Sequence, residues 1–193
     1  MQGKQFPKMV LASASPRRKE LLAQAGYNFI IEKSDIDESQ FSTKNIEPYK
    51  YAEQLALAKA KDVAQNHPDK IVLGADTIVD FRKTIIGKAA DENDAKNIIE
   101  KLFSESHKVI TGVAIIKLNE GIELVTHDVT IVHPKKMSPE QINNLLGTGS
   151  WKDKAGAYAI QENGDEFVER IEGSMTNVMG LPMELVQKLL EKF

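Results

Sequence analysis

The sequence predicts an α/β fold in which helices flank a mixed, twisted sheet and two lobes enclose a central cleft. Segments with helical apolar spacing and segments that are typical of strands both occur along the chain. Several strand-like segments follow one another directly, which is unlike a doubly wound fold, where strands and helices alternate. The length of 193 residues suits a single domain that spans 1–193.

Helix caps and turn residues divide the first half of the chain. Ser15 followed by Pro16 is typical of a helix start, and Gly26 is typical of a helix end. Ala25 is expected on the buried face of the helix between them. The predicted elements are strands at 9–12, 28–32 and 71–79, a hairpin partner at 84–86, and helices at 16–24 and 48–64.

The second half begins with a helix that Asp91 is expected to cap. Further on, Ser138 and Gln141 have the spacing of a capping box, so a helix is expected to begin there. The remaining predicted elements are strands at 108–118, 123–132 and 167–171, helices at 139–146 and 182–191, and a Gly- and Lys-rich loop at 147–156 that leads into 157–161.

Composition excludes several classes of protein. Hydrophobic residues make up 41% and charged residues 27%, which is typical of a globular protein in water. A net charge of −3 argues against nucleic acid as the main partner. The chain has no cysteine, which excludes disulfides, thiolate metal sites and a cysteine nucleophile. No signal-peptide core and no membrane-spanning apolar run is present, so we expect a cytoplasmic protein without a membrane partner.

The helix that begins at Pro16 carries an unfavourable charge at its start. Arg17 and Arg18 place cations at the positive end of the helix dipole, where each costs about 0.3–1 kcal/mol. The cost disappears if an anion binds there. A strand, a Ser-rich turn and this helix therefore predict a phosphate-binding site.

Two ionisable residues lie within apolar segments. Asp76 interrupts the predicted strand at 71–79, so it either faces a polar site as a general base or metal-facing carboxylate, or it caps a turn or pairs with a basic residue. Lys59 falls in the middle of the apolar face of the helix at 48–64. It either reaches through that face toward the anion or packs its stem and extends its ammonium into water.

Other polar residues are candidates for a nucleotide site. Lys88 follows Gly87 just beyond the predicted hairpin. Gln161 is suited to reading a base edge through its amide, and the alternative is a hydrogen-bonded amide in the core. Asp35, Asp37 and Glu38 have the oxygen ligands that Mg²⁺ or Mn²⁺ prefers, and the alternative is a solvated acidic turn.

These residues together fit the hydrolysis of a nucleoside polyphosphate. Several cations would hold the phosphates with a hydrated metal, and Asp76 would activate water. A P-loop, a GxSxG motif and metal-binding histidine spacings are all absent from the sequence.

At this point the sequence resembles a known family. The segment from Leu11 to Leu22, LASASPRRKELL, is similar to the N-terminal signature of the Maf family of nucleotide pyrophosphatases. Further blocks of the family follow in the same order and cover nearly the whole chain: Gly74–Thr77, Gly87-Lys88 with Asp91 and Asp94-Ala95, His107 through 111–114, Asp153–Tyr158 to Ile160-Gln161, and Gly173-Ser174 with Asn177-Val178 and 180–182.

The resemblance implies a two-lobed fold related to inosine triphosphate pyrophosphatases. It also implies cleavage of a nucleoside triphosphate to the monophosphate and pyrophosphate with a divalent metal, Mg²⁺ or Mn²⁺. The family's proton acceptor matches Asp76. The positions that select the substrate match Arg17, Thr77 and Gln161, those that bind phosphate resemble Ser13, Arg18, Lys59 and Lys88, and an acidic position lies near Asp37 or Glu38, so that Asp76 and Glu38 are the expected metal ligands.

The blocks around Asp76 and Gln161 resemble the branch of the family that acts on dTTP and UTP, rather than the branch that acts on 7-methyl-GTP. One departure is Ala89, where the family usually has proline, and this change is expected to loosen the loop of Lys88. The resemblance also suggests a homodimer.

Two functions other than dTTP and UTP hydrolysis stay open at this stage. The chain is either a nucleotide-regulated binding module that acts on septum formation, or an enzyme that also accepts modified pyrimidine nucleotides. Loss of turnover when Asp76 is replaced would favour an enzyme over a binding module.

Overall fold

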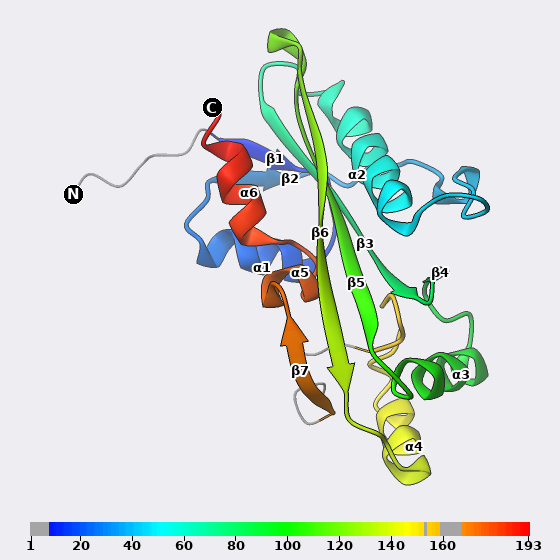
Figure 1. Ribbon diagram of the computed structural model, residues 1–193. Coiled ribbons are helices and arrows are strands. Elements are labelled where there is room, and N and C mark those ends of the chain that lie inside the picture. The colour runs from blue at the N-terminus through cyan, green and yellow to red at the C-terminus, as the bar shows by residue number, and fades with distance from the viewer. Residues whose placement is uncertain (1–7, 153, 159–166) are drawn as a thin grey trace.

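A seven-stranded mixed sheet organises the part of the chain that the computed structural model describes, which is residues 8–152, 154–158 and 167–193 (Figure 1). The strand order is β2-β1-β3-β5-β6-β7, and β4 pairs separately with β3. β1 is parallel to β2 and β3, whereas every other pairing is antiparallel. The strands are β1 (Met9–Leu11), β2 (Phe29–Ile31), β3 (Ile71–Phe81), β4 (Thr84–Ile86), β5 (His107–Lys117), β6 (Ile122–Pro134) and β7 (Val168–Glu172).

Helices cover both faces of this sheet. α2 packs on one face, and α1 and α6 pack on the other, while α3 and α4 lie together near the far ends of β3 and β5 (Figure 1). No helix within the described ranges is both long and apolar enough to span a bilayer. The helices are α1 (Pro16–Gln24), η1 (Glu38–Gln40), α2 (Pro48–Ala64), α3 (Glu92–Leu102), η2 (Leu118–Glu120), α4 (Pro139–Gly147), α5 (Met175–Val178) and α6 (Met183–Leu190).

The long strand β3 serves two separate hydrophobic cores on one face of the sheet. Leu73 and Ala75 pack with the buried residues of α1 and α6. Val79 and Phe81 pack with those of α3 and α4. Alternation along the strand explains why these odd-numbered residues share a face. The predicted mixed α/β fold with two lobes is therefore confirmed.

Two glycines let α2 approach the sheet closely. A Cβ atom on Gly74 would lie 2.4 Å from the carbonyl oxygen of Ala56, and one on Gly112 would lie 2.2 Å from that of Ala52. The helix presents small residues, Ala52, Ala56 and Ala60, to this part of the sheet, and all three are fully buried. The backbones of helix and strands are therefore in direct contact at this point.

One edge of β3 is divided between two partners. β1 pairs with Ile71–Leu73 and β4 pairs with Val79–Phe81, while β5 occupies the whole opposite edge. No described strand pairs with residues 74–78 on the divided edge. Asp76 and Thr77 lie in this gap, so the sheet opens at the two residues that the sequence singled out.

Most predicted elements are present with small shifts of their ends. The helices at 16–24 and 48–64, the hairpin at 84–86, the Asp91 cap and the Ser138–Gln141 capping box are confirmed. Ala25 is exposed, so its predicted burial was wrong, because the chain turns at Gly26 before it reaches the core. The predictions missed α5 and the single turn η1, which are too short for apolar periodicity to detect, whereas η2 lies at the turn expected between the two long strands.

Replacing Gly112 with alanine is expected to destabilise the fold by about 1–3 kcal/mol, since the new methyl group must displace the backbone of α2. Urea unfolding would measure this change. Gly147→Ala is the matched control, because Gly147 lies in α4 with open space around it and should tolerate the methyl group. Equal unfolding midpoints for the two variants would contradict the close approach.

Candidate active site

A pocket with a volume of about 910 Å³ lies at the gap between β1 and β4. Its size is in the range of small-molecule sites. Its walls come from distant parts of the chain: the β1–α1 loop, the segment around η1, the inner side of α2, the middle of β3, the loop after β4, residue 152 with the segment at 154–158, and the end of α5. Both lobes therefore contribute to a single cavity.

The pocket is strongly basic, although the whole chain has a net charge of −3. Seven basic side chains but only two acidic ones occur among its described lining residues. Such a local excess of positive charge selects a ligand with several negative charges. The basic residues are Arg17, Arg18, Lys33, Lys59, Lys88, Lys152 and Lys154, and the acidic residues are Glu38 and Asp76.

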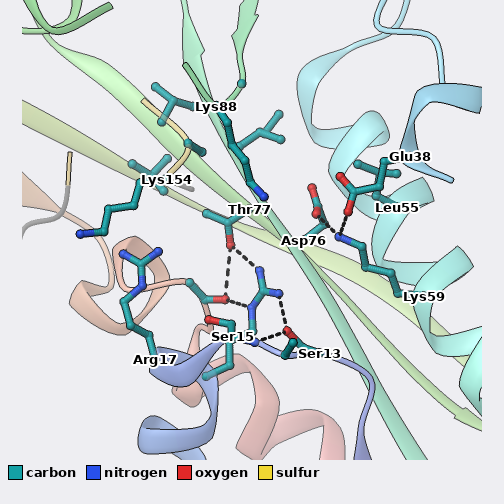
Figure 2. Close-up of a pocket in the computed structure, with 18 of the residues that line it drawn as sticks. Ser13, Ser15, Arg17, Glu38, Leu55, Lys59, Asp76, Thr77, Lys88 and Lys154 are labelled. Carbon is teal, nitrogen blue, oxygen red and sulfur yellow. Dashed lines mark hydrogen bonds and ion pairs between the residues drawn. The ribbon is translucent and has the colours of Figure 1, made fainter. Parts of the chain in front are cut away.

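Lys59 bridges the two acidic residues of the pocket. Its Nζ lies 2.6 Å from Oδ1 of Asp76 and 2.8 Å from Oε1 of Glu38 (Figure 2). The side chains of Lys59 and Asp76 are only 13% and 11% exposed, so this ion pair is largely shielded from water. Lys59 therefore reaches through the inner face of α2, but its ammonium contacts carboxylates there and does not extend into water as the alternative interpretation expected.

Asp76 has the properties of a proton acceptor. Burial raises the pKa of Asp76, and the positive charges of Lys59 and Arg18 only partly offset this effect. A carboxylate with a raised pKa is a stronger base near neutral pH. Burial also acts on Glu38, yet the hydrogen bond and charge of Lys59 hold the pKa of Glu38 below its usual range. The environments of the two carboxylates thus shift their pKa values in opposite directions.

Arg18 is part of the framework of the site. It is 9% exposed, and its guanidinium donates to the carbonyl oxygen of Gly180 at 2.8 Å, to Oγ of Ser13 at 3.0 Å and to Oγ1 of Thr77 at 3.0 Å. Burial lowers the pKa of Arg18, but a guanidinium remains charged at neutral pH. The prediction that Arg18 simply awaits an anion was incomplete, because the side chain also joins α1, β3 and the end of α5.

Arg17 and the start of α1 fit the predicted phosphate site. Arg17 lies one position earlier on the helix, is partly exposed and lines the pocket, with Lys88 and Lys154 around the same space (Figure 2). Ser15 begins the helix as expected, but its side chain makes no capping hydrogen bond. The amide groups of the first turn therefore stay available to an anion at the positive end of the helix dipole.

Thr77 points away from Asp76, as neighbouring residues on a strand do. Its Oγ1 lies 3.0 Å from Oγ1 of Thr111 and donates to the carbonyl oxygen of Gly180 at 3.3 Å, in addition to accepting from Arg18. Thr111 in turn donates to the carbonyl oxygen of Asn177 at 3.2 Å. In this structure Thr77 is therefore a contact between β3 and the segment after α5.

Asn177 is a supporting residue to which sequence reasoning gave no role. It is fully buried, and its Nδ2 donates to the carbonyl oxygen of Val109 at 3.1 Å and to Oγ1 of Thr130 at 2.9 Å. These bonds hold the segment that carries Gly180 against β5 and β6. Its place in the family block at Asn177-Val178 was the signal in the sequence.

Most of the residues predicted for the site meet in this pocket, but their roles remain predictions. Asp37 does not belong to it: its carboxylate caps η1 by accepting from Ser39 and Gln40. Gln161 lies outside the described residues. The predicted residues that line the pocket are Ser13, Arg17, Arg18, Glu38, Lys59, Asp76, Thr77 and Lys88.

The donor set of the pocket is compatible with Mg²⁺ or Mn²⁺. Asp76 and Glu38 supply hard oxygen ligands, and both already contact one cation, the Lys59 ammonium. No group of three or more potential metal ligands occurs in the described part of the chain. Two carboxylates suffice for Mg²⁺ when substrate phosphates complete its coordination.

Comparison with known proteins agrees with these features. The family model described as "Maf-like protein" matches residues 8–193. A protein named dTTP/UTP pyrophosphatase from Moorella thermoacetica is 45% identical, with 96% of this chain and 95% of that protein covered. One of the same name from Ruminiclostridium cellulolyticum is 43% identical, with 95% of each covered.

Solved structures of low sequence identity share the fold. The Ham1 protein of Staphylococcus aureus has a TM-score of 0.52 at 13% identity, and a HAM1 protein from Coxiella burnetii has a TM-score of 0.50 at 17% identity. Each comparison covers 96% of this chain and 99% of the other. These likenesses establish the architecture.

Carboxyl ¹³C NMR, with Asp76→Asn to assign the signal, should show Asp76 titrating above the ordinary value of about 3.9. Lys59→Met should raise this pKa further, because the ammonium favours the ionised carboxylate. Lys61→Met is the matched control, since Lys61 lies two residues along α2 and its side chain is 52% exposed. An unchanged or lowered pKa in Lys59→Met would refute the ion pair.

Proposed function

The chain belongs to the family of Maf-like proteins, and on this premise we propose that it is a pyrophosphatase that hydrolyses dTTP and UTP to the nucleoside monophosphate and pyrophosphate. The nucleoside triphosphate is its partner in this proposal. The chemistry belongs to the hydrolases that act on nucleoside triphosphates. The substrates are those in the names of the relatives, which match nearly the full length of the chain.

The observation that carries the proposal is a buried carboxylate with a raised pKa in a pocket lined by seven basic side chains. The basic side chains suit a triphosphate, which has several negative charges to neutralise. Asp76 suits the activation of water, which needs a base close to the reacting phosphorus. Neither feature alone would separate an enzyme from an anion-binding protein, but the pocket brings them together.

In the proposed reaction, Asp76 accepts a proton from a water molecule as the water oxygen attacks the α-phosphorus. A bond forms between that oxygen and phosphorus, and the bond from phosphorus to the α–β bridging oxygen breaks. Pyrophosphate leaves with the electron pair of the broken bond. Lys59 donates to Oδ1 of Asp76 at 2.6 Å, so it orients the carboxylate and leaves Oδ2 for the water.

The remaining cations of the pocket stabilise charge on the phosphates. Arg17 and Lys88 lie at the pocket wall, and their side chains form no hydrogen bond or ion pair with the described residues, so we assign them to the β- and γ-phosphates. Arg18 contributes from its fixed position near Thr77. Asp76 and Glu38 would hold Mg²⁺ or Mn²⁺, which supplies further neutralisation of the phosphate charge when bound.

Recognition of the base is assigned to Gln161 by resemblance, with Arg17 and Thr77 as the other selecting positions. Because Oγ1 of Thr77 already accepts from Arg18 and donates to the carbonyl oxygen of Gly180, we propose that Thr77 acts on selectivity by holding Arg18 in place. We also propose that the enzyme accepts modified pyrimidine nucleotides as substrates. The protein is further proposed to form a homodimer and to be located in the cytoplasm.

Pyrophosphate release from a panel of nucleoside triphosphates with Mg²⁺ or Mn²⁺ tests this function. We expect turnover of dTTP and UTP, and we expect Asp76→Asn to lower kcat by about 10²–10⁴-fold while nucleotide still binds, as is typical for loss of a general base. Asp80→Asn is the matched control: Asp80 is on the same face of β3, is equally buried at 8% exposure, and lies outside the described pocket lining.

Unchanged turnover in Asp76→Asn would remove Asp76 from the role of base. If the folded wild-type protein hydrolyses no nucleotide, the protein is better explained as a nucleotide-regulated binding module that acts on septum formation.

A further inference from the structure

Two loops that carry basic residues of the pocket are bonded to each other. Lys88 and Ala155 form an isolated antiparallel β-bridge, and the amide of Gly156 donates to the carbonyl oxygen of Gly87 at 3.1 Å. The segment after β4 and the segment at 154–158 are therefore held together at the pocket wall. This pairing supports the Lys88 loop directly, although Ala89 lacks the conformational restriction of the proline that the family usually has there.

The 154–158 segment is itself buried at Gly156 and Tyr158. Gly156 has a φ of +76°, and a Cβ atom there would lie 2.9 Å from Cγ2 of Val79 and 3.0 Å from Cδ1 of Leu102. Two residues later, the hydroxyl of Tyr158 lies 2.6 Å from Nε2 of His107. Tyr158 is 7% exposed and His107 is 2% exposed.

The direction of this hydrogen bond follows from its surroundings. Nδ1 of His107 lies 3.1 Å from the carbonyl oxygen of Leu102, which can only accept, so Nδ1 carries a proton. Burial lowers the pKa of His107, which keeps the ring neutral and leaves Nε2 as an acceptor. Tyr158 therefore donates to His107, and the imidazole connects the end of α3 to the loop.

Aromatic packing fixes the ring of Tyr158 on two sides. Its centroid is 5.2 Å from that of Phe103 and 5.7 Å from that of His107, and both contacts have edge-to-face geometry. The hydroxyl is thus the only part of Tyr158 that can be removed without disturbing this packing, and phenylalanine removes it alone.

We propose that His107 and Tyr158 are positioning residues for the phosphate-binding cations of the pocket. Their hydrogen bond fixes the 154–158 segment, and the bridge from Ala155 to Lys88 transmits that position to the Lys88 ammonium. This inference rests on the proposed function, in which Lys88 contacts the triphosphate. It predicts that Tyr158 and Lys88 act on anion binding as one unit.

The chain contains a single tryptophan that reports on this region without turnover. Trp151 precedes the segment and is 8% exposed, and Nζ of Lys152, which also lines the pocket, lies 5.7 Å from its ring centroid. An anion that attracts Lys152 changes the field at the indole. Tryptophan emission is therefore a direct readout of binding by inorganic tripolyphosphate, a probe with no base or ribose.

The test is a double-mutant cycle with Tyr158→Phe and Lys88→Met, read by tripolyphosphate binding and by dTTP kinetics. Tyr158→Phe should weaken tripolyphosphate binding and raise the KM for dTTP by about tenfold, with kcat changed much less, in the range seen for coupled residues. In the Lys88→Met background, Tyr158→Phe should cause little further loss. His107→Asn, whose shorter side chain has no atom at the position of Nε2, should reproduce the effect of Tyr158→Phe.

Tyr49→Phe is the matched control, because Tyr49 stacks on His127 outside the described pocket lining and should bind tripolyphosphate like the wild type. Circular dichroism establishes that each variant is folded. Wild-type affinity in folded Tyr158→Phe, or an equal loss in both backgrounds, would overturn the proposal. If the mutant cycle shows the coupling with tripolyphosphate but the wild-type protein hydrolyses no nucleotide, the proposed function fails while the positioning role stands.

Discussion

The close contact between α2 and the β3–β5 pair is the constraint on which the rest of the site depends. Gly74 and Gly112 have no side chains that would separate α2 from the sheet, and α2 places alanines against them. Because the backbones meet there, Lys59 on the next turn of α2 reaches the carboxylate of Asp76 with its ammonium. A helix held further from the sheet would leave Asp76 buried without the ammonium of Lys59, which is a costly arrangement.

The gap in the edge of β3 gives this buried pair access to a ligand. β1 pairs with β3 before Asp76 and β4 pairs with it after Asp76, so the cavity enters the sheet where no strand of the described part of the chain pairs with this edge of β3. Arg18 closes one wall by bonding to Ser13, Thr77 and Gly180, residues from three separate parts of the chain. These contacts of Arg18 thus hold the β1–α1 loop, β3 and the segment after α5 in fixed positions around the pocket.

Local sequence patterns predicted the helices and strands, but tertiary contacts determine the positions and partners of the site residues. Two features of the sequence located the pocket: the unfavourable charge of Arg17 and Arg18 at a helix start, and the lone carboxylate in an apolar strand. Each feature is destabilising unless a ligand or a partner residue compensates for it. The sequence could not predict that Arg18 is bonded into the fold while Arg17 is not, because the carbonyl oxygen that accepts from Arg18 lies 162 residues away. The His107–Tyr158 bond, at a separation of 51 residues, has no local sequence signal either.

The central claim is that Asp76 activates water for attack at the α-phosphorus. A single turnover of dTTP in H₂¹⁸O, with excess enzyme, tests it most directly. The account predicts one ¹⁸O atom in the monophosphate of the first turnover and none in pyrophosphate. Label in pyrophosphate would place the attack on another phosphorus, and an unlabelled monophosphate would mean that a carboxylate of the protein attacks in place of water.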